Sequence, residues 1–189
     1  TTLRWAMLYL ALNQEAQDKL RSEIHSVVGR DRIMRMADKS KMIYTQATVL
    51  EVQRMANVIG TNLPHWTNKD TVVKGQSIPK GTFINGDLHY VMARDPIFVN
   101  PDSFNPDRFL NEDGTALRKD LVDRVVAFSL GKRSCAGESL ARVELFLGLT
   151  ATIQNYRILP IKEDPIDLEP LSMIILQPKK DQFVKIEKV

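Results

Sequence analysis

The segment FSLGKRSCAG, residues 128–137, contains the only cysteine of the chain, Cys135. A cysteine thiolate is an iron ligand in proteins. The helix expected directly after Cys135 would direct backbone N–H groups and its positive dipole end toward the sulfur, which favours thiolate over thiol. Taken alone, a single cysteine is more often a small buried apolar residue. The neighbouring residues therefore decide whether this segment binds a metal.

The neighbours of Cys135 fit a short, stiff loop that approaches a flat iron-containing ring. Gly131 permits a tight turn, and Gly137 permits a helix to begin close to the ring. The guanidinium of Arg133 can reach a haem propionate with a fixed fork of hydrogen-bond donors. Phe128 can cover the sulfur side and exclude water, which would tune the iron. The five positions together predict a haem site with Cys135 as the iron ligand.

This segment resembles the haem-thiolate signature of the cytochrome P-450 monooxygenases, F-x-x-G-x-R-x-C-x-G, and matches it at every fixed position. The resemblance covers the whole chain, which corresponds to the C-terminal part of the family fold. It implies haem b (iron protoporphyrin IX) as the cofactor, with Cys135 as the axial ligand of the iron. The fold class expected is mainly α with small β-sheets (α+β). Residues 1–189 would form a single partial domain, incomplete relative to the family.

Three charged residues outside the loop are expected to hold the scaffold. Glu51 and Arg54 lie three residues apart on a predicted helix, so their side chains share one face. If exposed, such a pair would stabilise the protein by well under ~1 kcal/mol. In the family, this E-x-x-R pair joins an arginine from a later loop, and the segment FNPDRF supplies Arg108 at that place. The resemblance implies a structural triad that supports the loop of Cys135.

Further residues are expected around the bound group. The run Leu63-Pro64-His65, followed by Asp70, resembles the microsomal drug-, steroid- and fatty-acid-oxidising branch of the family, in which this histidine bonds a haem propionate. A lone histidine is otherwise more often a surface or hydrogen-bonded core residue. An apolar pocket would take a lipophilic small molecule. By the same resemblance the residues that line the substrate pocket are Ile59, Thr61, Leu63, Leu171 and Ser172, with ordinary core packing as the alternative for each.

The resemblance also implies partners and a location. Electrons would come from a flavoprotein NADPH reductase, with cytochrome b5 as an optional second donor, and the parent protein would lie on the cytoplasmic face of the endoplasmic reticulum membrane. Its membrane segment would lie outside this sequence. The net charge of +3 is too small to indicate nucleic acid binding. The candidates for a positive surface that steers an acidic reductase are Lys132, Arg142, Arg118, Lys119 and Arg124, with a solvated charge run as the alternative.

The rest of the sequence predicts the elements that carry these residues. Hydrophobic and charged contents of 43% and 26% are ordinary for a globular protein. The sequence contains no run of 18 apolar residues and no signal peptide, and its single cysteine excludes an intrachain disulfide. Apolar periodicity predicts helices over residues 1–12, 14–28, 43–58 and 138–154. Strands are predicted at 71–73, 76–78, 82–85, 171–177 and 183–186, and residues 93–113 are predicted to be irregular with one short helix.

The chain begins within a predicted helix, and we expect it to be a fragment of a longer protein. The family's proton-delivery motif, A-G-x-[DE]-T-T, would lie just upstream of Thr1 and Thr2, so neither is assigned as catalytic. The fragment alone is expected to be inactive. For the parent protein the resemblance implies a monooxygenase that inserts one atom of O2 into a lipophilic substrate. Two alternatives stay open: a haem-thiolate isomerase or dehydratase that needs no O2, and a non-catalytic haem-binding remnant.

Overall fold

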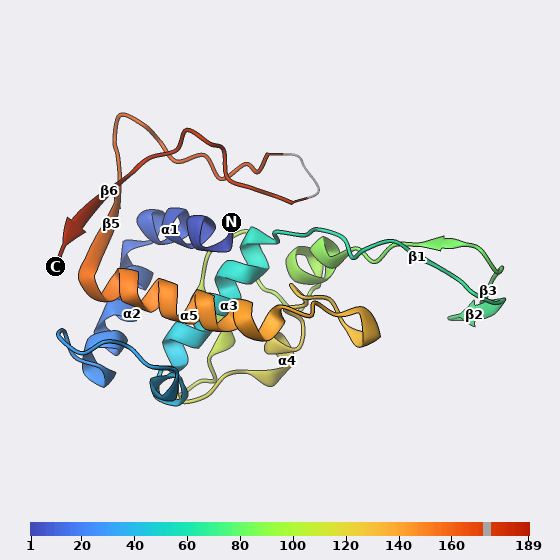
Figure 1. Cartoon of the computed structure of the whole chain (residues 1–189), viewed down its shortest axis with the longest axis horizontal. Helices are drawn as coiled ribbons and strands as arrows, with labels where there is room; N and C mark the ends of the chain where they lie inside the picture. The colour runs from blue at the N-terminus through green and yellow to red at the C-terminus, as the bar shows by residue number, and fades with distance from the viewer. Residues whose placement is uncertain (172–174) are drawn as a thin grey trace.

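The computed structural model describes residues 1–171 and 175–189 and has a helical body from which a β-rich arm extends (Figure 1). The α-helices are α1 (Thr2–Leu12), α2 (Gln14–Val27), α3 (Ile43–Ala56), α4 (Lys119–Val122) and α5 (Glu138–Asn155). The shorter helical segments are η1 (Met36–Lys41), η2 (Tyr90–Arg94, a π-helix), η3 (Pro106–Phe109) and η4 (Gly131–Arg133). The strands are β1 (His65–Trp66), β2 (Thr71–Val73), β3 (Gln76–Ile78), β4 (Phe83–Ile84), β5 (Tyr156–Pro160) and β6 (Val184–Lys188).

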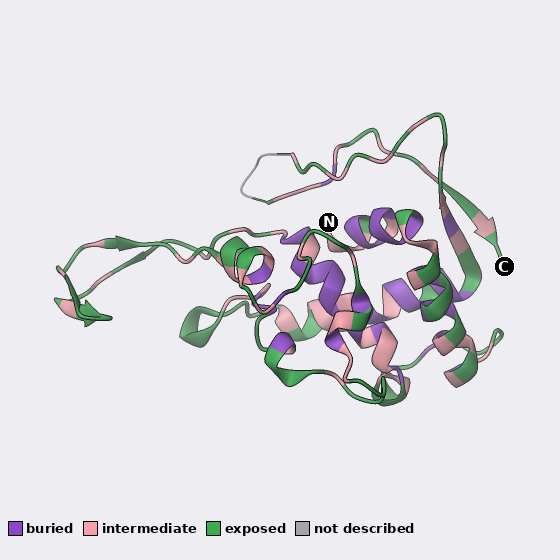
Figure 2. Ribbon diagram, turned by 180° about the vertical axis from the view of Figure 1, so that it is seen from behind, coloured by how far each residue is buried: buried purple, intermediate pink, exposed green. Residues whose placement is uncertain are grey.

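The core lies between α1, α2, α3 and α5, which contact one another. Helix α1 is apolar nearly all round, as expected of a helix packed on several sides, and Leu10 on it is fully buried. Helix α2 is amphipathic and buries Leu20 and Ile24, whereas its opposite face is charged. Figure 2 shows that the buried residues are concentrated in this body and that the arm is largely exposed. Burial of these apolar faces is the main term that stabilises the fold.

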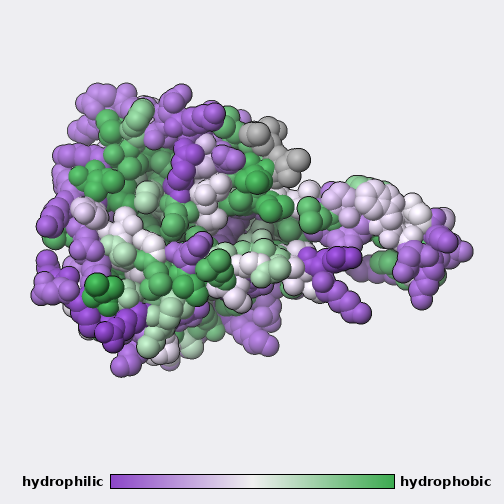
Figure 3. Space-filling view, viewed as in Figure 1, coloured by the Kyte–Doolittle hydropathy of each residue, from purple (hydrophilic) through white to green (hydrophobic). Residues whose placement is uncertain are grey.

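The arm consists of two small antiparallel pairs, β1 with β4 and β2 with β3. Lys74 and Gly75 connect β2 to β3 with φ angles of 49° and 81°, which is the pattern of a tight two-residue hairpin turn. Trp66 and Phe83 pack edge to face with their ring centroids 5.4 Å apart. In the space-filling view, hydrophobic side chains gather over the middle of the helical body, and the arm projects from it (Figure 3). This arm begins at His65, which connects it to the candidate site.

The predicted α+β fold class and most of the predicted elements are confirmed. Strands β2 and β3 have the predicted bounds, and the four predicted helices are present. Helix α3 ends two residues early because Asn57 adopts a left-handed conformation with φ of 39°. Within residues 93–113, η3 is the one short helix that begins there, and η2 ends there. No helix within residues 1–171 or 175–189 is long and apolar enough to cross a membrane.

The predictions for the C-terminal tail were partly wrong. Leu171 and Gln177 form only an isolated bridge, and residues 172–174 between them lie outside the described ranges. The strand predicted at 183–186 is β6, displaced to Val184–Lys188. Its partner is β5, which the sequence analysis did not predict. The tail is instead fixed by contacts to the body: the backbone N–H of Leu176 donates to the carbonyl of Val58 at 2.8 Å.

Candidate functional site

The loop before α5 brings the backbone of Cys135 against the backbone of Phe128. The backbone N–H of Cys135 donates to the carbonyl of Phe128 at 2.9 Å, which closes the loop. The chain can turn back within this span because Ser129 and Gly131 both have positive φ angles, 63° and 81°. Only glycine adopts such angles without steric cost, which explains the residue type at position 131. Phe128 and Cys135 are therefore fixed relative to each other by the backbone.

The thiol of Cys135 is exposed rather than buried in the core. Within the described chain, Cys135 therefore does not act as a small apolar packing residue. Gly137, the residue before α5, has an ordinary φ of −90°, so its conformation does not require glycine. A Cβ atom built on Gly137 would lie 3.8 Å from the sulfur of Cys135. The glycine therefore leaves free the space directly beside the sulfur.

A hollow of about 330 Å³ brings together residues from four separate segments of the chain. Cys135, Arg133 and Phe128 line it from the loop before α5. Ile59 and Leu63 line it from the segment after α3, and both are exposed. The list of lining residues is completed by Thr2, Gln53, Val58, Asn62, His65, Leu88, Ala127 and Ser129. Most of the residues predicted around the bound group thus share one concave surface, which is the usual form of a small-molecule site.

Three of the predicted pocket residues are not placed in this hollow. Thr61 forms an isolated backbone bridge with Asp87, and its side chain does not line the hollow. Leu171 is bridged to Gln177 in the tail and does not line it either. Ser172 lies outside the described residues. Of the five predicted pocket residues, Ile59 and Leu63 line this hollow.

Gln53 is a residue of the hollow that the sequence analysis missed. It lies on α3 and is only 4% exposed, yet its side-chain oxygen Oε1 accepts no hydrogen bond within the described chain. An unsatisfied buried polar group costs about 1–3 kcal/mol, so such a group in a binding wall is a candidate to bond a ligand or a bound water. A single glutamine on a predicted helix carries no sequence signal that distinguishes it from a surface residue.

Glu51, Arg54 and Arg108 form a buried ion-pair network. Both oxygens of Glu51 accept from Arg54, from Nε at 2.8 Å and from Nη2 at 3.0 Å. Oε1 of Glu51 also accepts from Nε of Arg108 at 3.1 Å. The side chains of Glu51 and Arg54 are 0% and 1% exposed, so the exposed-pair alternative does not apply. Because buried charges are costly unless paired, the network depends on all its members.

The network ties helix α3 to η2 and to the irregular segment between η2 and η3. Arg54 donates to the carbonyls of Met92 and Pro101 at 3.1 and 2.7 Å. Arg108 donates to three further carbonyls of this segment, those of Val99, Asn100 and Ser103. The residues of α3 that carry the network are next to Gln53, which lines the hollow. The network therefore fixes the helix that forms one wall of the site.

The cations predicted to form a positive surface are mostly neutralised. Each of four is paired with a carboxylate: Arg118 with Asp120, Lys119 with Asp123, Arg124 with Asp95, and Arg142 with Glu138. Within the described chain, Lys132 and Arg133 form no ion pair. Exposed ion pairs screen each other and leave little long-range field. The positive charge near the site is thus concentrated on Lys132 and Arg133.

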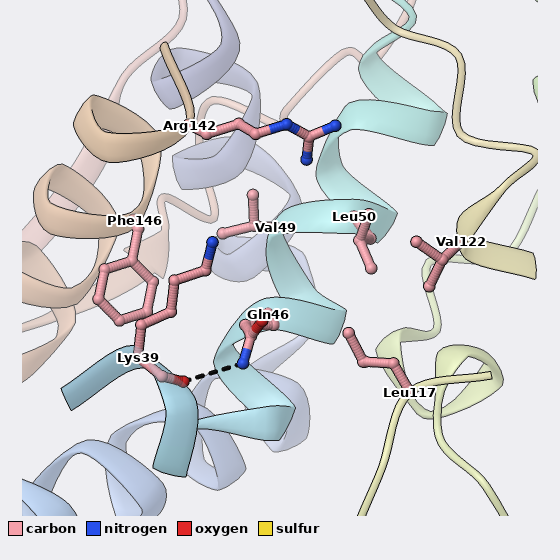
Figure 4. Close-up of a pocket in the computed structure, with 8 residues that line it drawn as sticks. All are labelled: Lys39, Gln46, Val49, Leu50, Leu117, Val122, Arg142 and Phe146. Carbon is pink, nitrogen blue, oxygen red and sulfur yellow. Dashed lines mark hydrogen bonds between the residues drawn. The ribbon is translucent and has the colours of Figure 1, made fainter. Parts of the chain in front are cut away.

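A second, smaller hollow of about 130 Å³ lies between η1, α3 and α5 (Figure 4). Gln46 donates to the carbonyl of Lys39 at 2.9 Å on one side of it. On the other side, Arg142 extends from α5 toward α3 (Figure 4). None of the residues predicted to bind the haem lines this hollow.

Comparisons with known proteins indicate the family of this chain. The family model described as Cytochrome P450 matches residues 1–185. Cytochrome P450 2H1 of Gallus gallus is 43% identical over 172 residues, which cover 90% of this chain and 34% of that protein. For cytochrome P450 2U1 of Bos taurus the identity is 41% over 167 residues, 87% of this chain and 30% of that protein. For cytochrome P450 2K1 of Oncorhynchus mykiss it is 37% over 192 residues, 100% of this chain and 37% of that protein.

The chain thus spans about a third of the length of the curated relatives that it matches. The match of the family model extends over both the loop of Cys135 and the network of Glu51. On these grounds the chain belongs to the cytochrome P450 family.

Proposed function

We propose that this chain is the haem-binding part of a haem-thiolate monooxygenase. The observation that carries the proposal is that one hollow is lined by Cys135, whose thiol is exposed, by Arg133 and by His65. A sulfur ligand, a cation and a histidine within one apolar cavity form the donor set that an iron porphyrin with two carboxylates needs.

Three features of the hollow support the fit of a haem. Arg133 forms no ion pair within the described chain, so its guanidinium is available for a propionate. The space beside the sulfur of Cys135 is left free by Gly137. Gln53 offers a buried oxygen without a donor. Residues that pack only against their own chain would not be expected to leave a cation, a thiol and an amide oxygen without partners on one surface.

A haem held at Cys135 would supply the redox chemistry by which one atom of O2 is inserted into a substrate. The residues of this chain would bind and orient it. Cys135 would provide the thiolate ligand of the iron, and Arg133 and His65 would hydrogen-bond the propionates. Phe128 would exclude water from the sulfur side, and the Glu51–Arg54–Arg108 network would keep α3 and the following segment in place.

The finer features of the function are part of the same proposal. Ile59 and Leu63 give the hollow an apolar wall, which favours a lipophilic substrate such as a drug, a steroid or a fatty acid. The exposed cation Lys132, which forms no ion pair within the described chain, favours an acidic electron donor, and we propose a flavoprotein NADPH reductase, with cytochrome b5 as a second donor. For the whole protein we propose the cytoplasmic face of the endoplasmic reticulum membrane, by analogy with the microsomal branch.

The test uses the full-length protein reconstituted with haem, a flavoprotein reductase and NADPH. A steroid and a long-chain fatty acid serve as probes, under an atmosphere of isotopically labelled dioxygen. A monooxygenase places one labelled atom in the product and consumes NADPH. A rearranged product without label would instead identify an isomerase or dehydratase. A protein that binds haem but forms no product from either probe and does not consume NADPH would support the non-catalytic alternative.

A further inference from the structure

Arg142 is in contact with the aromatic ring that the proposed function places over the sulfur. The guanidinium carbon of Arg142 lies 5.2 Å from the centroid of the Phe128 ring, within the range of a cation–π interaction. The same guanidinium is paired with Glu138, which accepts from Nε at 2.8 Å and from Nη2 at 2.7 Å. Arg142 and Glu138 lie one turn apart on α5, the helix that begins just after Cys135. Glu138 thus orients the guanidinium over the ring.

We propose that Arg142 is a positioning residue that acts on Cys135 through Phe128. This inference rests on the proposed function, because it concerns the thiolate that would bind the iron. Arg142 itself does not line the hollow. Its influence on the site is therefore exerted through the ring on which it lies.

The backbone gives this influence a direct route. The carbonyl of Phe128 accepts the N–H of Cys135 at 2.9 Å, so a displacement of Phe128 displaces the residue that carries the sulfur. The intervening residues are held in left-handed conformations at Ser129 and Gly131, which the surrounding contacts have to maintain. Phe128 is only half-buried, so packing alone does not fix its ring. The Arg142–Glu138 pair supplies a contact from the helix side.

This role also explains why Arg142 is a poor docking charge. Its guanidinium is already engaged by a carboxylate and an aromatic face, and its side chain is 38% exposed. Figure 4 shows the side chain extended across the gap between α5 and α3, away from its own helix. A cation held in this way orders the loop, and it exerts little long-range attraction on a partner protein.

The test is a double-mutant cycle on the full-length, haem-loaded protein with Arg142→Met, Phe128→Leu and the combined variant. The readouts are the reduction potential of the haem and the half-life of the red-shifted Soret band of the reduced carbon-monoxide complex, which reports thiolate ligation. Arg142→Lys is the conservative variant. Arg157→Met is the matched control, because Arg157 is 37% exposed and paired with Asp18 but is not stacked on an aromatic ring within the described chain.

We expect Arg142→Met to shorten the half-life of the red-shifted band several-fold and to shift the potential, with Arg142→Lys in between and Arg157→Met unchanged. In the Phe128→Leu background the same substitution should have no further effect on the half-life. An unchanged half-life in Arg142→Met, or an equal shortening in both backgrounds, would overturn the inference. A wild-type protein that binds haem without the red-shifted band would overturn the proposed function itself, which keeps the two failures apart.

Discussion

Glu51 and Arg54 form a two-pronged ion pair with N···O distances of 2.8 and 3.0 Å, and both side chains are almost completely buried. Arg108 adds a third bond to the same carboxylate. A carboxylate that serves two buried guanidinium groups cannot be replaced without leaving positive charge uncompensated. The stability of the fold around the site should therefore depend on this one acidic residue.

We predict that Glu51→Gln lowers the free energy of unfolding by about 3–5 kcal/mol, because it leaves Arg54 and Arg108 without their shared anion. Chemical denaturation of the full-length protein measures this change. Glu15→Gln is the matched control, since Glu15 is 88% exposed in its pair with Lys19 and its loss should cost less than ~0.5 kcal/mol. Equal effects of the two substitutions would show that the buried network does not stabilise the fold.

The conformation of the Cys135 loop gives a second prediction. Gly131 has φ of 81°, so Gly131→Ala should destabilise the protein by about 1–2 kcal/mol and should also lower its haem content. Gly29→Ala provides the comparison, because Gly29 has φ of 86° and open space around it but lies far from the loop along the chain, after α2. The Gly29→Ala variant should be destabilised by a similar amount and should retain its haem. Both quantities come from thermal unfolding and from haem absorbance per polypeptide.

The comparison of haem content between the Gly131→Ala and Gly29→Ala variants decides this prediction. If Gly29→Ala lowers the haem content as much as Gly131→Ala, haem loss follows general destabilisation and the loop has no special role. If neither substitution reduces stability, the left-handed conformations are not maintained in solution.

The ionisation of Tyr9 gives a third prediction. Burial raises the pKa of Tyr9 from 10.0 to about 12, and the neighbouring Arg54 opposes this rise only in part. Because the neutral form is favoured in the folded state, the contribution of Tyr9 is constant below pH 10 and is lost as the pH rises from about 10 to about 12. Absorbance of tyrosinate during an alkaline titration should show a late step that Tyr9→Phe removes. A titration curve that Tyr9→Phe does not change in this range would contradict the prediction.

The sequence identified the parts of the structure that depend on local signals. The Lys74-Gly75 turn predicted the β2–β3 hairpin, and the periodic apolar residues of α2 predicted its buried face. Strand β5 was missed because its partner β6 lies more than twenty residues further along the chain, and strand pairing of this kind leaves little local pattern. Of the strand predicted at 171–177, the described residues form one isolated bridge, and Leu176 is bound to the body through the carbonyl of Val58.

In the candidate site, too, residues within a local motif could be predicted from the sequence, whereas residues that depend on packing could not. The loop of Cys135 is one contiguous motif, and its residues could be named from the sequence. Gln53 could not, because its importance lies in a buried oxygen without a donor, which only the packing of α3 reveals. The stack of Arg142 on Phe128 joins two segments through side-chain geometry and has no sequence signature of its own.

The most direct test of the account is the reduced carbon-monoxide difference spectrum of the haem-reconstituted full-length protein, with Cys135→Ser as the control. The account predicts a strongly red-shifted Soret band in the wild type that is absent in Cys135→Ser, because it assigns the thiolate of Cys135 as the iron ligand that produces the band. A folded, haem-loaded wild type without that band, or a band that survives in Cys135→Ser, would contradict the assignment of Cys135 and with it the monooxygenase proposal.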